Sequence, residues 1–258
     1  MRDLRTTFDE DAARYDRARP GYPPALVHDL VDLTGIGPGS RVVEIGPGTG
    51  QGTATLVAAG AEVVAVELGA NLAAVLRANL AGTPLDVVVE AFEEWPIPTN
   101  GFDAVVAFTS WHWLDPAIRT TKVAALLRPG GVIATVSTEH VAGGSTELFD
   151  ELQHCYEQWD PATPPGLRLR AADDIAPMLD EIDRSTDFQP AIRRRFQQGI
   201  TYSTNEYLDL LNTYSGHRAL GRTQREGLFD CIARHIDDEP SQTMTKRYLY
   251  ELRVAARR

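Results

Sequence analysis

One short segment constrains the fold of this chain more than any other, an apolar run that is followed by alternating glycines, VVEIGPGTGQGT at residues 42–53. Gly46, Gly48 and Gly50 carry no β-carbon, so the backbone here can take positive φ angles at little cost and can approach a ligand closely. Turns of this kind bind phosphates and dinucleotides, and they also bind small adenosyl cofactors. The rest of the chain has to decide among these ligands.

The glycine turn lies within an alternation of apolar runs and helical patterns. Strands that are apolar on both faces and alternate with helices are typical of a parallel sheet that is covered on both sides. Right-handed crossovers leave an open, doubly wound α/β sheet as the simplest topology. The predicted strands are residues 41–46, 62–67, 85–91, 102–108 and 132–138, and the predicted helices among them are 51–61, 71–82 and 116–131.

The alternation stops after the fifth predicted strand. Residues 139–190 hold short helical patterns broken by proline, and we expect them to form an insertion over the sheet. Residues 191–203 alternate as an edge or antiparallel strand does, and two helical patterns follow them. Residues 244–258 read as a final strand. The sequence therefore predicts further strands beside the parallel part of the sheet.

Composition narrows the class of protein. The chain has 258 residues and a net charge of −11, which disfavours a nucleic-acid partner. No apolar run approaches the ~20 residues of a membrane span, and the polar, acidic start does not read as a signal or transit peptide. Cys155 and Cys231 lie far apart without CxxC spacing, so we expect neither a disulfide framework nor a cysteine zinc site, and the cytoplasm is the expected location.

Two of the three ligand classes fit the glycine turn poorly. A P-loop requires a glycine followed by lysine, and the sequence has no Gly-Lys pair. The dinucleotide fingerprint GxGxxG requires a third glycine where Gln51 or Thr53 stands, so a nicotinamide or flavin dinucleotide is disfavoured. What remains is the pattern E-x-GxGxG at the end of the first predicted strand.

This pattern resembles motif I of the class I S-adenosylmethionine-dependent methyltransferases. Other segments follow in the order expected of that family. Glu67 ends the second predicted strand, residues 90–108 resemble the passage from the third strand into the fourth, and LLRPGG at 126–131 resembles the turn into the fifth. The resemblance covers about residues 1–138 and returns in the last strand.

A narrower resemblance is to the methyltransferase type 11 group that includes trans-aconitate methyltransferase. It rests on FDEDAARYDRARPGYP at residues 8–23 and SWHWLDP at 110–116. It implies transfer of a methyl group from S-adenosyl-L-methionine to a small-molecule acceptor, with a carboxylate or a phenol as the expected class. The alternatives are methylation of a tRNA or protein, and a non-catalytic module that only binds the cofactor.

The resemblance also implies the architecture, a Rossmann-like, seven-stranded, mostly parallel sheet with an antiparallel C-terminal strand and a helical insertion after strand five. The whole of residues 1–258 is expected to be a single methyltransferase domain. Its expected parts are an N-terminal cap over the cofactor at 1–40, a cofactor-binding core at 41–138, a substrate-side insertion at 139–190 and completion of the sheet at 191–258. The oligomeric state is not predicted.

The resemblance assigns the cofactor residues one by one. The turn backbone would meet the amino-acid part of the cofactor, and Glu44 would orient the turn or face the ammonium group, unless local amides satisfy it. Glu67 would accept hydrogen bonds from both ribose hydroxyls. Arg19 would pair with the methionine carboxylate, unless it only occupies a surface bend. The full expected set is Arg19, Glu44, Gly46, Gly48, Gly50, Glu67, Leu68, Ala91, Phe92 and Thr109.

Adenine recognition departs from the family pattern, because Ala91 stands where the family usually has an acid. The adenine would then be read by backbone near Ala91, with Phe92 stacking on the ring and Glu90 or Glu93 replacing the acid. Phe92 as an ordinary core residue is the alternative.

Substrate residues are expected after the fourth strand and in the N-terminal segment. Trp111 and Trp113 would present π faces to the sulfonium or to an aromatic acceptor, or would simply pack. His112 is the candidate catalytic residue, as a general base or hydrogen-bond partner, with packing as its alternative. Tyr15 and Tyr22 complete the expected substrate set, and no metal ion is expected because the donor carries its own leaving group.

Overall fold

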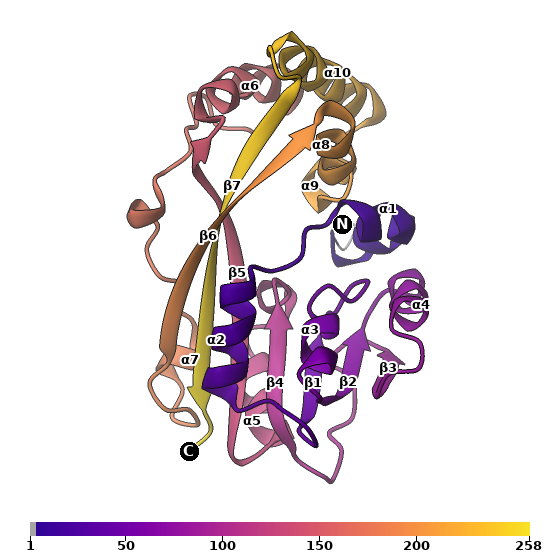
Figure 1. Cartoon of the computed structure of the whole chain (residues 1–258), viewed down its shortest axis with the longest axis vertical. Coiled ribbons are helices and arrows are strands. Elements are labelled where there is room, and N and C mark those ends of the chain that lie inside the picture. The colour runs from indigo at the N-terminus through magenta and orange to yellow at the C-terminus, as the bar shows by residue number, and fades with distance from the viewer. Residues whose placement is uncertain (1–3) are drawn as a thin grey trace. The chain divides into compact units, whose positions relative to one another are not determined.

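The computed structural model describes residues 4–258, which include a sheet with the strand order β3-β2-β1-β4-β5-β7-β6 (Figure 1). Pairing is parallel between β3, β2, β1, β4 and β5. The strand bounds are β1 Arg41–Ile45, β2 Glu62–Glu67, β3 Leu85–Val89, β4 Phe102–Phe108, β5 Leu127–Gly144, β6 Ile192–Ser203 and β7 Thr243–Ala256. The predicted seven-stranded, mostly parallel α/β sheet is confirmed.

The last two strands run antiparallel. Arg195 and Thr201 of β6 bond to Glu251 and Thr245 of β7 respectively, so residue numbers rise along one strand as they fall along the other. Strand β6 lies at the end of the strand order, which confirms its prediction as an edge strand. Its alternating exposure and its arginines suit an edge, where charged side chains discourage pairing with another chain.

The chain packs as two compact units, which we describe separately. The glycine-turn unit comprises residues 20–138, 177–196 and 250–258, and the helical unit comprises the described residues up to Arg19 together with 139–176 and 197–249. The long strands β5, β6 and β7 contribute residues to both units.

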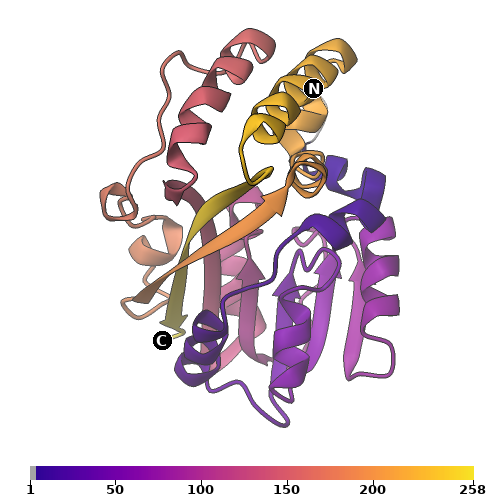
Figure 2. The ribbon, with the colours of Figure 1, turned by 45° about the horizontal axis from the view of Figure 1, so that its top comes forward.

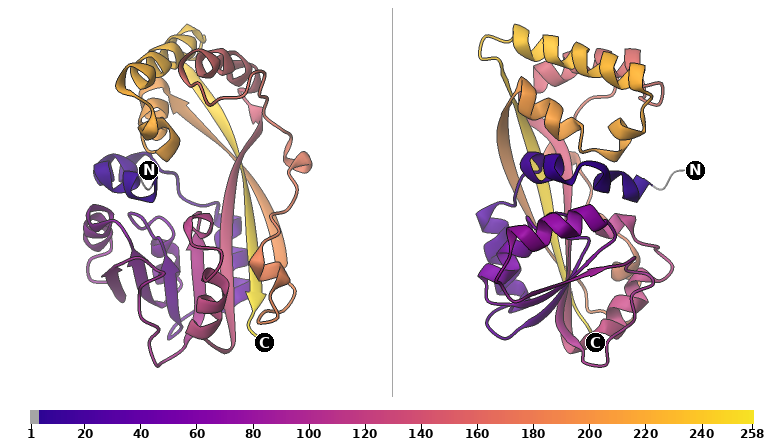
Figure 3. Two further views of the ribbon diagram at one scale, coloured as in Figure 1. Left: turned by 180° about the vertical axis from the view of Figure 1, so that it is seen from behind. Right: turned by 90° about the vertical axis from the view of Figure 1, so that its right-hand side faces the viewer.

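The glycine-turn unit has helices on both faces of its parallel strands. Helices α3 and α4 connect strands in the direction of β3, whereas α5 connects β4 to β5 in the opposite direction, so right-handed crossovers place them on opposite faces. Figure 3 shows α5 on the face turned away from the viewer of Figure 1. The bounds are α2 Pro24–Thr34, α3 Thr53–Ala58, α4 Ala70–Asn79, η2 Trp111–Trp113, α5 Arg119–Leu126 and α7 Glu181–Arg184.

Both faces of the central strands are buried because helices cover them. Val43 of β1 and Val105 of β4 are fully buried, and Phe102 and Leu126 add large side chains to the same core cluster. Each such side chain contributes roughly 1.5–3 kcal/mol when it is removed from water. Because these strands are parallel, the core holds the carboxyl ends of β1, β2 and β4 side by side at the same end of the sheet.

The helical unit is built mainly of α6, α8 and α10, and α6 and α10 pack against each other (Figure 2). Its elements are η1 Leu4–Asp11, α1 Ala12–Ala18, α6 Thr146–Trp159, η3 Ala172–Asp174, α8 Thr204–Leu211, α9 Ser215–Ala219 and α10 Arg222–Asp238. Among residues 4–258 there is no helix with the length and apolar character that a membrane span requires.

The structure corrects two expectations. Strand β5 continues to Gly144, so the first six residues of the predicted insertion belong to the sheet, with Val141 fully buried. Cys155 and Cys231 form a disulfide with an S–S distance of 2.00 Å, although we expected no disulfide framework. Their 76-residue separation hid the pairing, because only the packing of α6 against α10 brings the two cysteines together.

Candidate cofactor site

The glycine turn leaves β1 with a backbone that requires glycine. Gly46, Gly48 and Gly50 have φ angles of 62°, 62° and 104°, which L side chains rarely adopt. Space is also restricted, because a β-carbon at Gly46 would lie 2.8 Å from Cβ of Ser110. Ser110 was missed by the sequence analysis, and its hydroxyl donates to the carbonyl of Ile45. Ser110, which follows β4, therefore packs against the start of the turn and holds it close to the end of β4.

Glu67 ends β2 and holds the turn through backbone amides. One carboxylate oxygen accepts from the N–H of Gly48 at 2.9 Å, and the other accepts from the N–H of Gly69 at 2.8 Å. The side chain is only 6% exposed. Charge-assisted bonds of this kind are stronger than neutral ones, so Glu67 fixes the turn whatever else it binds.

Glu44 lies within β1 and is fully buried. Within residues 4–258 neither of its carboxylate oxygens has a hydrogen-bond partner. Burial raises the pKa of Glu44 to about 8; the hydroxyl of Thr53 opposes this shift and the negative charge of Glu67 reinforces it. The expected alternative of a carboxylate satisfied by local amides is therefore not what the structure shows. A buried carboxyl group without a partner is costly, and a positive charge would relieve that cost.

Thr109 follows β4 in a strained conformation. Its φ is 53°, and a β-branched residue with positive φ is a rare outlier that tends to persist at functional sites. Its hydroxyl lies 3.0 Å from the hydroxyl of Tyr22, and the Tyr22 ring packs 4.6 Å from that of Phe108. Tyr22 and Thr109, both predicted site residues, are thus brought together at the end of β4.

The residues near the ends of β2 and β3 include Ala91 and Phe92, which were expected to contact adenine. Leu68 and Val89 are 37% and 42% exposed at the ends of β2 and β3, where apolar side chains open to solvent can cover a flat ring. Ala91 is half-buried beside them in sequence. Phe92 is only 3% exposed and belongs to the core cluster, with the Lys122 ammonium 5.2 Å from its ring centroid. This geometry favours the core alternative for Phe92.

Trp111 and Trp113 differ in their surroundings. Trp111 is 3% exposed, and its indole N–H donates to Asp180 at 2.8 Å, which favours packing over substrate contact. Trp113 is half-buried and stacks at a tilt on His112, with 4.9 Å between ring centroids. His112 is exposed to solvent. Partial desolvation of its ring lowers its pKa, and the positive charge of Arg119 lowers it further, so the imidazole is neutral at pH 7.

A buried ionic network supports η2, and the sequence analysis missed it. Arg253 of β7 donates to both carboxylate oxygens of Asp180, at 2.7 and 2.8 Å, and Arg119 donates to the carbonyl of Trp111 at 2.7 Å. Burial alone would raise the pKa of Asp180, but the bonds and charge of Arg253 outweigh it and the net shift is downward. No sequence signal could have paired residues this far apart.

Arg19 and Tyr15 lie in the helical unit. The Arg19 guanidinium donates to the hydroxyl and carbonyl of Thr213 at 2.9 and 3.0 Å. It also lies 4.9 and 4.7 Å from the ring centroids of Tyr15 and Tyr214. Arg19 therefore has an extensive set of contacts inside its own unit, and its expected role toward the methionine carboxylate stays a prediction.

Comparison with known proteins bears on the glycine-turn unit. Residues 43–135 match the family described as "Methyltransferase domain". An uncharacterized methyltransferase of Mycobacterium tuberculosis is 38% identical over 135 residues, which are 52% of this chain and 53% of that protein. The chain thus spans about half the length of the curated relatives that it matches.

Two solved structures share the fold. A protein of Anaeromyxobacter dehalogenans, assigned as a type II methyltransferase, aligns with a TM-score of 0.57 and 21% identity over 92% of this chain and 97% of its own. A phosphoethanolamine N-methyltransferase of Haemonchus contortus, in complex with phosphomonomethylethanolamine and S-adenosylhomocysteine, aligns with a TM-score of 0.54 and 18% identity over 99% of this chain and 60% of its own. The sequence match of residues 43–135, the strand order and the glycine turn together support a class I S-adenosylmethionine-dependent methyltransferase.

Proposed function

We propose that this protein uses S-adenosyl-L-methionine to methylate a small molecule. The observation that carries the proposal is the fully buried carboxyl group of Glu44, which has no hydrogen-bond partner among residues 4–258 and lies in β1, the strand that leads into the glycine turn. A cofactor with an ammonium and a sulfonium group would bring positive charge that can balance this carboxyl group. A pyrophosphate would instead bring negative charge toward two carboxyl groups, at a cost in free energy.

The chain offers a group for each part of the cofactor. The backbone from Gly46 to Gly50 would receive the amino-acid end, and Glu44 would balance its ammonium. Glu67 would accept from the ribose hydroxyls, since a carboxylate has about four acceptor positions. Leu68 and Ala91 would flank the adenine. When bound, the cofactor supplies an electrophilic methyl group with its leaving group attached.

A small-molecule acceptor agrees with three observations. The net charge of −11 disfavours nucleic acid. The Haemonchus contortus enzyme of the same fold holds phosphomonomethylethanolamine. The neutral imidazole of His112 can accept a proton from a phenol, whereas a carboxylate acceptor would need no base. Tyr22 and Trp113 are the side chains that we propose to contact the acceptor, and carboxylates and phenols remain the proposed classes.

Two broader statements belong to the same proposal. Residues 1–258 act as one methyltransferase domain, supported by fold similarity over 92% of the chain to the Anaeromyxobacter dehalogenans protein. The cytoplasm stays the proposed location, although the Cys155–Cys231 disulfide is of a kind that is rare in cytosolic proteins.

Calorimetry with S-adenosyl-L-methionine and S-adenosylhomocysteine tests the cofactor, with NAD and FAD as comparison ligands. We expect both adenosyl compounds to bind and neither dinucleotide to do so. Binding of NAD or FAD without binding of the adenosyl compounds would contradict the proposal. Release of S-adenosylhomocysteine across a panel of carboxylic acids and phenols then tests the acceptor. A protein that binds the cofactor but turns over no acceptor would be the binding module instead.

His112 can be tested with a matched control. We expect His112→Ala to lower turnover while cofactor affinity stays constant, because the imidazole acts on the acceptor. His28→Ala replaces an exposed histidine of α2 and should change neither quantity. Equal turnover in the two variants would return His112 to a packing role.

A further inference from the structure

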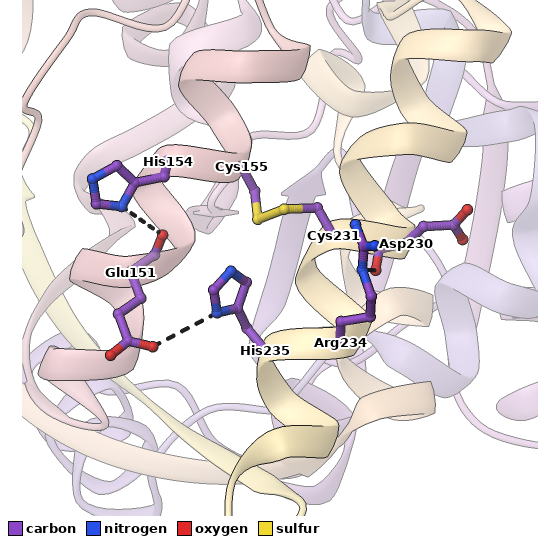
Figure 4. Close-up of a disulfide and its surroundings, with 7 residues drawn as sticks. All are labelled: Glu151, His154, Cys155, Asp230, Cys231, Arg234 and His235. Carbon is purple, nitrogen blue, oxygen red and sulfur yellow. Dashed lines mark hydrogen bonds and ion pairs between the residues drawn. A yellow bond between two sulfur atoms is a disulfide. The ribbon is translucent and has the colours of Figure 1, made fainter.

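The cysteine pair of the helical unit belongs to a four-residue cluster on two packed helices. Helix α6 carries Glu151 and Cys155, and α10 carries Cys231 and His235. Each pair is spaced i, i+4, so its members lie on one helix face a turn apart. Figure 4 shows the Glu151 carboxylate pointing toward the His235 ring, next to the two sulfurs.

Three members of this cluster lie at the mutual distances of a ligand set, and Glu151 adjoins them through His235. The two Sγ atoms and a ring nitrogen of His235 all lie within 4.8 Å of one another. Oε2 of Glu151 is 3.6 Å from Nδ1 of His235. That contact is too long for a hydrogen bond, so a cation between the two groups would replace no strong bond. The His154 ring points away from the sulfurs.

We propose that the reduced form of this cluster binds a thiophilic divalent cation, with Zn²⁺ as the best match. Two thiolates, one imidazole and one carboxylate are ligands that Zn²⁺ takes in tetrahedral sites. Two ligands spaced i, i+4 on a helix can share one ion, as in other zinc sites. The sequence alone gave no zinc spacing, because the four ligands come as two pairs separated by 76 residues.

Reduction and binding balance as two steps. A dithiol reductant gives two electrons and two protons to the S–S bond, becomes a disulfide itself, and leaves thiols at Cys155 and Cys231. Metal binding then releases those two protons to solvent as two sulfur–metal bonds form. The disulfide and the metal-bound form exclude each other, because a sulfur in an S–S bond is not a thiolate.

Exposure allows an ion to enter from one side. Cys155 is fully buried, whereas the side chains of His235 and Glu151 are 38% and 62% exposed. The sulfurs would therefore form the inner part of the site, and the imidazole and carboxylate its solvent side.

The test uses the full chain, reduced with a phosphine that is itself oxidised to the phosphine oxide and is then removed under inert gas. We expect Co²⁺ to bind at one ion per chain with thiolate charge-transfer absorption, and Zn²⁺ to displace it. Both thiols should become protected from alkylation. The oxidised protein should show no such absorption.

Variants locate the ligands. His235→Ala should weaken Co²⁺ binding by about tenfold or more, since loss of a group that only hydrogen-bonds to a metal ligand already costs about 10–100-fold in metal affinity. The neighbouring His154→Ala is the matched control and should bind as the unaltered protein does. Because Cys155 is fully buried and its replacement can disturb folding, the comparison of the two histidine variants decides. Reduced protein without thiolate absorption, or equal affinity in the two variants, would overturn the proposal.

Discussion

The carboxylate of Glu67, at the end of β2, accepts a hydrogen bond from the backbone N–H of Gly48, 2.9 Å away in the turn that follows β1. The conformation of the glycine turn therefore depends on the carboxylate of Glu67 as well as on the glycines themselves. One residue fixes the turn and stands where the ribose hydroxyls are proposed to bind.

Replacing Glu67 should weaken both functions. Glu67→Ala leaves the amides of Gly48 and Gly69 without their carboxylate acceptor in a buried place, and we expect S-adenosyl-L-methionine binding to weaken by about 1–3 kcal/mol. Calorimetry below the unfolding temperature measures this. Glu62→Ala, at the exposed start of the same strand, is the control. Affinity that is unchanged in Glu67→Ala would exclude Glu67 from the site.

Glu44 should make stability depend on pH in an unusual direction. Its folded pKa of about 8 lies above the ordinary 4.5, so the folded state holds the proton more tightly than the unfolded state. Stability should therefore fall as pH rises from about 4.5 and level off above about 8, with a total loss on the order of 5 kcal/mol.

Denaturant unfolding at a series of pH values measures this loss. Glu44→Gln has nothing to titrate and should flatten the profile, so that the variant gains stability relative to the unaltered chain as pH rises. A profile of the same slope in both proteins would contradict the raised pKa. Bound S-adenosyl-L-methionine should also reduce the slope in the unaltered chain, if its ammonium balances Glu44 as proposed.

Gly46 should tolerate no side chain. Gly46→Ala combines a φ of 62° with a contact of 2.8 Å to Cβ of Ser110. Gly82→Ala has a comparable φ of 81° with nothing within 4 Å, so it isolates the cost of the backbone conformation. That cost is roughly 1–2 kcal/mol. Thermal unfolding should show a larger loss for Gly46→Ala, and only this variant should lose cofactor binding.

Arg253 should be essential for the support of η2. Arg253→Met leaves the buried Asp180 without its main partner, and breaking a buried pair costs about 3–5 kcal/mol. Arg119 is too distant to replace it, since its contact to Asp180 is 3.9 Å. The double variant Asp180→Asn with Arg253→Met removes both charges while the Asn amide oxygen can still accept from Trp111 or from the backbone N–H of Ile182, and it should recover part of the loss in chemical denaturation. Equal losses in the single and double variants would show that the pair itself contributes little.

The same pair has a pH dependence that can be checked. The folded pKa of Asp180 is lowered, so its stabilising contribution is present above the unfolded pKa and is lost as pH falls through the folded value. We expect the unaltered chain to lose stability in acid more steeply than the double variant. Parallel acid profiles would contradict this.

The sequence by itself determined the parallel half of the fold and the place of the glycine turn. A continuous apolar run predicts a strand that is buried on both faces, and it can be recognised from neighbouring residues alone. The same holds for Gly46 and Gly48, because their positive φ angles favour glycine. Glu67 was assigned through the resemblance to the methyltransferases, which place an acid at the end of the second strand.

Only the tertiary structure decided the relationships that join distant segments. It placed Phe92 and Trp111 in the core, left Glu44 without a hydrogen-bond partner among residues 4–258, and joined Arg253 to Asp180. It also brought Cys155 to Cys231 and His235 on a neighbouring helix. Burial and long-range contact depend on which elements pack together, and a pattern of neighbouring residues does not carry that information.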